Sequence, residues 1–129
     1  MNDSVADMIT RIKNAQGVGK DSVTVSFSKL KLSIAEVLQK GGFIKGFAKK
    51  GKKINKSLEI ELLYENKKPK VRGANRVSKL SRRVYQKSAD IRKVRHGYGM
   101  TVFSTPKGVL SGADAVKEGV GGEALFNIW

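Results

Sequence analysis

The side chains with the most informative chemistry lie in two short stretches near the C-terminus, Ser104–Gly108 and Gly121–Glu123. Hydroxyl groups both donate and accept hydrogen bonds, and glycine lets the backbone come close to a ligand. Such groups suit the wide, shallow minor groove of duplex RNA, which is lined with 2′-hydroxyls. The candidate nucleic-acid contacts in these stretches are therefore Ser104, Thr105, Gly108, Gly121, Gly122 and Glu123.

The glycines in these stretches also have a simpler explanation, because isolated glycine pairs usually form ordinary turns. Pro106 fixes its own φ and favours an extended Thr105, so the first stretch is stiff before any partner arrives. The pair Gly121-Gly122 allows a close backbone approach or offers two N–H groups to an anion. Two such stretches on either side of one short helical pattern favour binding over ordinary turns.

The sequence has no pattern for catalysis or for a cofactor. It contains no cysteine and one histidine, His96, which argues against a metal site or a catalytic triad. Glu59 and Glu61 alternate on a predicted strand, where they would offset neighbouring lysines, and Glu123 has no visible partner for general base catalysis. We therefore expect no enzyme activity, no metal, no cofactor and no small-molecule substrate.

The charge of the chain indicates a polyanionic partner. The formal net charge is +15 over 129 residues, and the pI is about 10.2. Residues 65–96 carry twelve Lys or Arg and two acids, a net of +10, whereas residues 96–129 carry two Lys and three acids. RNA, DNA or an anionic membrane surface would match this charge. We expect the basic segment to attract the partner and the small polar residues downstream to select it.

Tyr85 lies within the basic segment. An aromatic ring in such a context can stack on a base or a sugar. A tyrosine in the core or on the face of a sheet explains the residue equally well, and the sequence leaves both explanations open.

The first half of the chain alternates helical and strand patterns. Helices are predicted at 4–17 and 29–40 from apolar residues three and four apart. Strands are predicted at 22–27, 43–49 and 58–64 from alternation or apolar runs. The order α-β-α-β-β predicts two helices against a small antiparallel sheet, which forms an N-terminal subdomain of residues 1–64.

The two predicted helices carry further candidate contacts. Lys29 and Lys31 lie in the first turn of the second helix, where the helix dipole disfavours cations. They are either solvated or stabilised by an external anion. Thr10 and Asn14 are neighbours on the polar face of the first helix. The apolar face of the second helix is expected to contain Leu30, Ile34, Val37 and Leu38.

The second half, residues 65–129, is predicted to be a mostly antiparallel β subdomain with a short helix. Ser111 would cap that helix and Gly119 would end it. A turn or linker is predicted at 66–69, strands at 71–77, 84–85, 100–103 and 121–129, the short helix at 111–118, and another short helix from Ser88 that carries Arg92, Lys93 and Arg95. The whole chain is thus predicted to be α+β.

The sequence gives no sign of a membrane segment. No apolar run approaches the length that spans a bilayer. The N-terminal helical pattern contains Asp3 and Asp7, unlike a targeting peptide. We expect a soluble, cytoplasmic protein.

Several short motifs, in this order and spacing, resemble one protein family. They are Asp7–Asn14, Ser28–Lys31 followed by Gly41–Ile44, Arg76–Ser78, Arg83–Tyr85, Ser104-Thr105-x-x-Gly108-Val109 and Gly121–Glu123. With them the chain resembles, over essentially its whole length, the bacterial form of the eighth protein of the small ribosomal subunit.

The resemblance implies a two-subdomain α+β fold and direct binding to the central domain of small-subunit rRNA, early in assembly of the platform. It implies neighbouring small-subunit proteins as partners and, in some members, repression of a ribosomal-protein mRNA that mimics the rRNA site. The main contacts would come from the two C-terminal stretches with Tyr85 nearby, and further contacts from Thr10, Asn14, Lys29 and Lys31.

This sequence departs from the family pattern at a few positions. The family usually has proline where Ser4 stands, and a small polar residue where Pro106 stands. It often has Asp-Arg in place of Gly112-Ala113 and arginine in place of Val116. The missing arginines weaken any expectation that the 111–118 helix contacts phosphate.

Two other classes of function would use some features of this sequence but not all of them. A general nucleic-acid-binding protein or RNA chaperone needs the charge but not the neutral Ser-Thr turn. A membrane-surface protein needs a strongly basic amphipathic helix, and the predicted helices have only modest basic faces.

Overall fold

The structure is a computed structural model that describes residues 4–51, 56–79, 81–92 and 99–129. The chain divides into two compact units, residues 2–72 and 73–129. Residues 65–72 therefore group with the first unit. The predicted subdomain boundary between residues 64 and 65 stays a prediction, because compactness alone does not show which segment folds independently.

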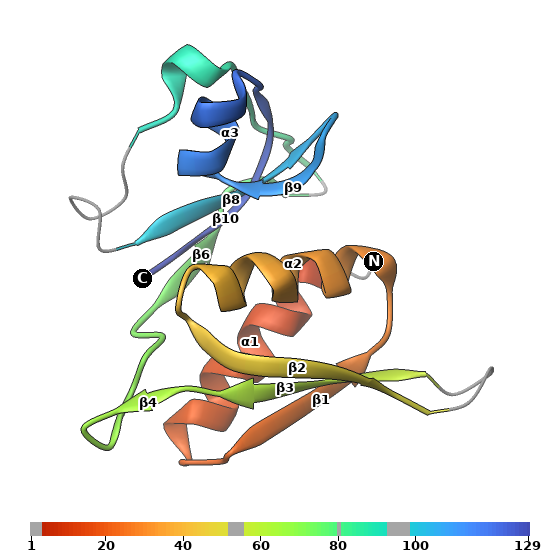
Figure 1. The fold of residues 1–129 in the computed structure, drawn as a ribbon, viewed down its shortest axis with the longest axis vertical. Helices are drawn as coiled ribbons and strands as arrows, with labels where there is room; N and C mark the ends of the chain where they lie inside the picture. Colours follow the sequence, from red (N-terminus) through yellow and green to blue (C-terminus); the bar gives the residue numbers. More distant parts are fainter. Residues whose placement is uncertain (1–3, 52–55, 80, 93–98) are drawn as a thin grey trace. The chain divides into compact units, whose positions relative to one another are not determined.

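The N-terminal unit has the predicted α-β-α-β-β order (Figure 1). Its strands form an antiparallel sheet in the order β1-β3-β2. The elements are α1 (Ser4–Gly17), β1 (Ser22–Ser26), α2 (Lys29–Lys40), β2 (Ile44–Lys50) and β3 (Ser57–Leu62). The α+β prediction for this half is confirmed.

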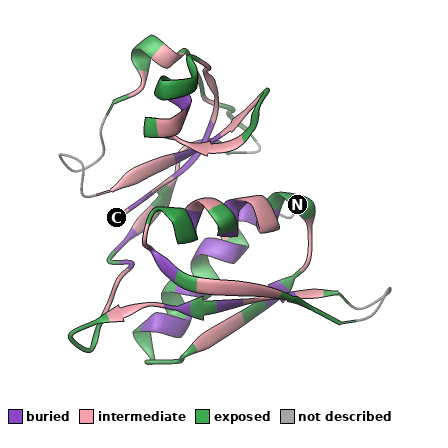
Figure 2. Ribbon diagram, viewed as in Figure 1, coloured by how far each residue is buried: buried purple, intermediate pink, exposed green. Residues whose placement is uncertain are grey.

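One face of this sheet is buried and the other is not. On β3, Leu58, Ile60 and Leu62 are buried, whereas Glu59 and Glu61 between them are half-buried or exposed. Side chains alternate between the faces of a strand, so the helices cover the leucine and isoleucine face (Figure 2).

The buried face of α2 is rotated from the one predicted. Leu30 is 37% exposed, whereas Lys31 is only 4% exposed. The prediction that Leu30 belongs to the core is therefore wrong, whereas Ile34 and Leu38 are buried as predicted, together with Ala35. Ser28 caps the helix as predicted, since its Oγ accepts a hydrogen bond from the Lys31 N–H at 3.1 Å.

A small hairpin that the sequence left as a turn or linker follows β3. It consists of β4 (Tyr64–Glu65) and β5 (Lys68–Pro69). Asn66 and Lys67 connect them with φ of 53° and 65°. Two successive positive φ values are typical of the tight turns that suit the twist of a hairpin.

The C-terminal unit is a β subdomain with one short α-helix. Its strand order is β6-β10-β8-β9, and β7 also pairs with β10. The elements are β6 (Ala74–Arg76), β7 (Tyr85–Gln86), the 3-10 helix η1 (Ser88–Asp90), β8 (Met100–Thr105), β9 (Gly108–Ser111), α3 (Gly112–Glu118) and β10 (Gly122–Ile128).

Several details of this half differ from the predictions. The expected strand at 71–77 is shorter, and β9 was not predicted. The helix expected from Ser88 is a single 3-10 turn that ends before Arg92, while Lys93 and Arg95 lie outside the described residues. The strand at 84–85 is shifted by one residue to Tyr85–Gln86. These elements are short and have little local periodicity from which to be predicted.

Helix α3 packs on one face of the C-terminal sheet. Phe103 is fully buried, and its ring lies 3.4 Å from the position that a Cβ on Gly112 would take. Ser111 caps the helix by accepting from the Asp114 N–H at 3.2 Å, and Gly119 ends it with a φ of 69°. Both predicted ends of this helix are confirmed.

No helix in the described part of the chain is long and apolar enough to cross a membrane.

Candidate nucleic-acid interface

Three of the predicted site residues lie side by side across adjacent strands of the C-terminal sheet. Glu123 of β10 is opposite Tyr85 of β7 on one side and opposite Ser104 of β8 on the other. Residues opposite each other in antiparallel strands point to the same face. We call Tyr85, Glu123 and Ser104 the polar row. Because neighbouring strands are about 4.8 Å apart, the row spans roughly 10 Å.

The polar row lies on the face of the sheet opposite to α3. Phe103, the neighbour of Ser104 on β8, points toward α3. Successive residues of a strand point to opposite faces, so Ser104 points away from α3. The side chain of Tyr85 is 70% exposed, which decides against a core tyrosine. An exposed ring beside a carboxylate and a hydroxyl offers a stacking surface and two kinds of hydrogen-bonding group.

Glu123 forms an ion pair with Arg83. The Arg83 Nη1 donates to the Glu123 Oε2 at 3.0 Å. The Glu123 side chain is 16% exposed and the Arg83 side chain 46%. Arg83 lies two residues before Tyr85, just outside β7, and its guanidinium reaches the carboxylate opposite Tyr85. The carboxylate in the row is therefore held by a neighbouring cation.

Ser104 and Thr105, which the sequence placed in a turn, form the end of β8 and have different roles in the structure. Thr105 Oγ1 donates to the Gly108 carbonyl at 2.7 Å and accepts from the Lys107 N–H at 3.1 Å, so it closes the turn. Among the described residues, the Ser104 hydroxyl has no hydrogen-bond partner. Ser104 therefore has hydrogen-bonding capacity left for a ligand, whereas Thr105 mainly shapes the turn.

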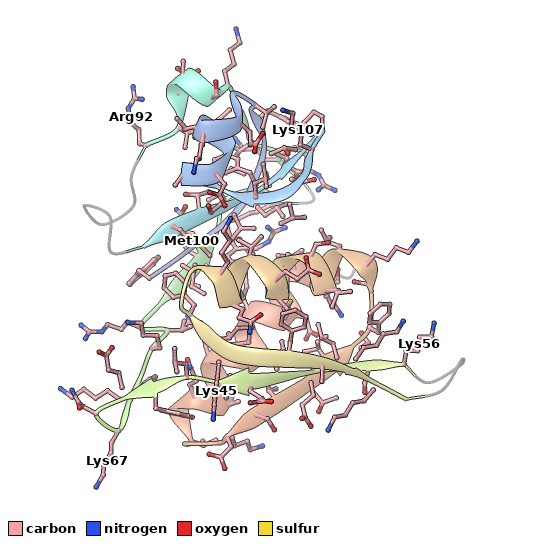
Figure 3. The ribbon with its side chains drawn as sticks, viewed as in Figure 1. Lys45, Lys56, Lys67, Arg92, Met100 and Lys107 are labelled. Carbon is pink, nitrogen blue, oxygen red and sulfur yellow. The ribbon has the colours of Figure 1, made fainter. Side chains whose placement is uncertain are left out.

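The rest of the turn is built for a tight hairpin between β8 and β9. Gly108 has a φ of 109°, a conformation that other residues rarely adopt. Lys107 lies at the tip, where its amine contacts the Glu118 carboxylate of α3 at 3.3 Å (Figure 3). The exposed pair contributes little stability, and it turns the amine of Lys107 toward α3.

The close backbone approach expected at the double glycine is directed toward the protein itself. A Cβ on Gly121 would lie 2.2 Å from the Gln86 carbonyl oxygen. A Cβ on Gly122 would lie 2.2 Å from the Ser104 carbonyl oxygen. The glycines therefore let β10 come close to β7 on one side and to β8 on the other, which brings the members of the polar row together.

A basic loop between Ser78 and Val84 leaves the sheet and returns to it beside the polar row. Ser78 is fully buried, and its Oγ accepts from the Val84 N–H at 2.9 Å and donates to the Val84 carbonyl at 3.3 Å. Val84 in turn accepts from the Ala124 N–H at 2.9 Å. The loop ends are thereby joined, and the backbone between Arg83 and Tyr85 is fixed. The loop carries Lys79, Arg82 and Arg83 on its exposed side.

Ser78→Ala tests this closure. We expect it to lower the free energy of unfolding by about 1 to 2 kcal/mol, because the Val84 N–H loses its partner in a part-buried position. The measurement is urea unfolding followed by circular dichroism. Ser81→Ala is the matched control, since Ser81 is exposed in the same loop and should change stability by less than about 0.5 kcal/mol. Equal effects of both substitutions would contradict a structural role of the Ser78 hydroxyl.

The candidate residues of the N-terminal unit differ in how far they are exposed. Thr10, Asn14 and Lys29 are exposed. The amine of Lys31 donates to the Ser26 Oγ at 2.8 Å and to the Ser26 carbonyl at 3.2 Å. Neither alternative considered for Lys31, a solvated side chain or one stabilised by an external anion, matches this buried arrangement. Lys29 keeps its amine at the surface.

Arg83 and Ser78 were not among the predicted site residues. Arg83 could have been found from the sequence, because it precedes Tyr85 by two residues and an extended chain would place both on one face. Ser78 gave no such signal, since its burial depends on the pairing of β6 and β7 with β10.

Known proteins of one family match this chain over nearly its whole length. The family model for ribosomal protein S8 matches residues 3–129. Proteins named small ribosomal subunit protein uS8 from Novosphingobium aromaticivorans and Vesicomyosocius okutanii are each 45% identical to the chain, and one from Streptomyces griseus is 43% identical. Each of these matches covers 100% of this chain and 98% of the relative.

Proposed function

Because this chain belongs to the ribosomal protein S8 family, we propose that it works in the small ribosomal subunit by binding the central domain of small-subunit rRNA directly. The family membership confirms the resemblance noted in the sequence and the prediction of a structural ribosomal protein rather than an enzyme. At its place on the ribosome the protein would help to assemble the platform beside other small-subunit proteins. Repression of a ribosomal-protein mRNA with a similar site would use the same surface.

The observation that most supports specific RNA binding is the polar row. Its exposed ring, carboxylate and hydroxyl are on one sheet face, and Arg83 balances the carboxylate. A stacking ring and hydrogen-bonding groups suit a splayed base or the 2′-hydroxyls of a minor groove. The surrounding loop supplies Lys79 and Arg82 for phosphate, which adds affinity without selecting a sequence.

A general nucleic-acid-binding protein remains the second candidate because of the net charge of +15. Such a protein would bind unrelated duplexes as tightly as rRNA. It would have no use for a charge-balanced carboxylate, since an acid repels phosphate. The Glu123–Arg83 pair therefore favours the specific function.

Binding of a central-domain rRNA fragment and of an unrelated RNA duplex, measured across salt concentrations, tests the proposal. We expect the wild-type protein to prefer the rRNA fragment at moderate salt. Ser104→Ala should weaken fragment binding by about 3- to 10-fold, the equivalent of one net hydrogen bond, with little change in the salt slope. Equal affinity of the wild-type protein for both RNAs would reject specific binding.

The matched control is a change in charge away from the polar row. Replacing Lys52 and Lys53 with glutamine should weaken both RNAs alike and reduce the salt slope, because lysine contacts to phosphate release counterions from any sequence. These two lysines lie outside the described residues, so this control rests on the sequence.

A further inference from the structure

The Glu123–Arg83 pair leaves part of the carboxylate available. The Arg83 guanidinium contacts Oε2 at 3.0 Å, and no described residue donates to Oε1. Glu123 lies between Tyr85 and Ser104, with a side chain that is 16% exposed. A carboxylate in that position can accept a hydrogen bond from a base N–H or a 2′-hydroxyl.

Arg83 is attached to a rigid part of the chain. Its neighbour Val84 is held on both sides, by the buried Ser78 hydroxyl and by the Ala124 N–H. The planar guanidinium starts from this held backbone, and its contact with Oε2 restricts the rotation of the Glu123 carboxylate. The Glu123 carboxylate that Arg83 contacts is carried by β10, which pairs with β7 on one edge and with β8 on the other.

We infer that Arg83 is a positioning residue, which orients the Glu123 carboxylate so that its second oxygen selects a hydrogen-bond donor of the RNA. This role deepens the proposed function and rests on it. Arg83 adds to specificity through Glu123 and not mainly through phosphate. The neighbouring Arg82, also exposed but without a described carboxylate partner, provides affinity alone.

A double-mutant cycle tells whether Arg83 acts by orienting Glu123 or by contacting phosphate. The proteins are wild type, Arg83→Gln, Glu123→Ala and the double variant, each checked for folding by thermal melting. The probes are a central-domain rRNA fragment and an unrelated RNA duplex. We expect each single variant to lose about 10-fold in affinity for the fragment. For the duplex, Arg83→Gln should lose less than that, and Glu123→Ala should lose nothing. The double variant should lose no more than Glu123→Ala alone, because Arg83 then has nothing to orient.

Two further variants make the test sharper. Arg82→Gln should weaken both RNAs equally and lower the salt slope by slightly less than one. Arg83→Lys should keep the salt slope of the wild type but not its full preference for the fragment, because an ammonium lacks the planar fork. Both contrasts separate orientation of the carboxylate from simple attraction of phosphate.

The outcomes are distinguishable. A wild-type protein that binds both RNAs equally would overturn the proposed function and this inference together. A wild-type protein that prefers the fragment, combined with additive losses in the cycle, would overturn the role of Arg83 alone. Equal losses of Arg83→Gln for both RNAs would likewise make Arg83 a phosphate contact.

Discussion

Gly122→Ala should destabilise the protein by about 3 kcal/mol or more, at the upper end of the usual cost of overpacking. The new Cβ would lie 2.2 Å from the Ser104 carbonyl oxygen, 2.9 Å from the Ser104 carbonyl carbon and 3.1 Å from the Thr105 Cα. All three are backbone atoms, so no side chain can rotate out of the way. Strands β8 and β10 would have to separate at the point where the polar row crosses them.

Urea unfolding followed by circular dichroism measures this effect. Gly17→Ala is the control, because a Cβ at Gly17 meets nothing within 4 Å and the residue ends α1. Alanine is favoured over glycine in a helix, so this variant should be as stable as the wild type or gain up to about 1 kcal/mol. A Gly122→Ala protein with the unfolding midpoint of the wild type would show that β8 and β10 are farther apart than described.

The same variant has a second readout in RNA binding. Any folded fraction of Gly122→Ala would hold Ser104 away from Glu123, because the displaced strand carries Ser104. We therefore expect lost preference for the rRNA fragment, with weak charge-driven binding retained. The glycine thus acts on specificity through the spacing of strands, although the sequence suggested a direct approach to RNA.

Helix ends could be predicted from the sequence because their causes are local. Ser28 and Ser111 cap α2 and α3, and Gly119 ends α3 in a left-handed conformation. Each of these features depends on a few neighbouring residues. The prediction of the α-β-α-β-β order succeeded for the same reason, since the apolar periods of those segments are long enough to be distinctive.

The polar row could not be assembled from the sequence alone. Tyr85, Ser104 and Glu123 were each predicted as candidates, but their alignment depends on the register of β10 with two other strands. A shift of one residue would turn Glu123 to the other face of the sheet. The close approaches of Gly121 to Gln86 and of Gly122 to Ser104 fix that register through contacts between segments far apart in the chain. The hydrogen bond from the Ala124 N–H to the Val84 carbonyl adds another such contact.

Lys31 is a second case in which distant packing decided the role of a residue. The sequence placed Lys29 and Lys31 together in the first turn of α2 as equivalent cations. The structure separates them, because Lys31 is buried against the end of β1 and Lys29 is exposed. The dipole of α2 disfavours a cation at this end, and the Ser26 oxygens at 2.8 and 3.2 Å offset that cost for Lys31.

Lys31→Ala should therefore lower the free energy of unfolding by about 1.5 to 3 kcal/mol, since it removes hydrogen bonds from a charged donor and the packing of a buried aliphatic stem. Lys29→Ala is the matched control and should change stability by less than about 0.5 kcal/mol. Urea unfolding of the two variants under the same conditions gives the comparison.

For RNA binding we expect the opposite ranking, with a larger effect of Lys29→Ala than of Lys31→Ala. If Lys29 contacts phosphate, Lys29→Ala should reduce the salt slope by slightly less than one, because one fewer counterion is released. Folded Lys31→Ala should keep the slope of the wild type, because the Lys31 amine is bonded to Ser26 and has little surface to offer to phosphate. A Lys31→Ala protein with normal stability and a reduced slope would mean that the amine leaves Ser26 for the RNA, and would return Lys31 to the set of direct contacts.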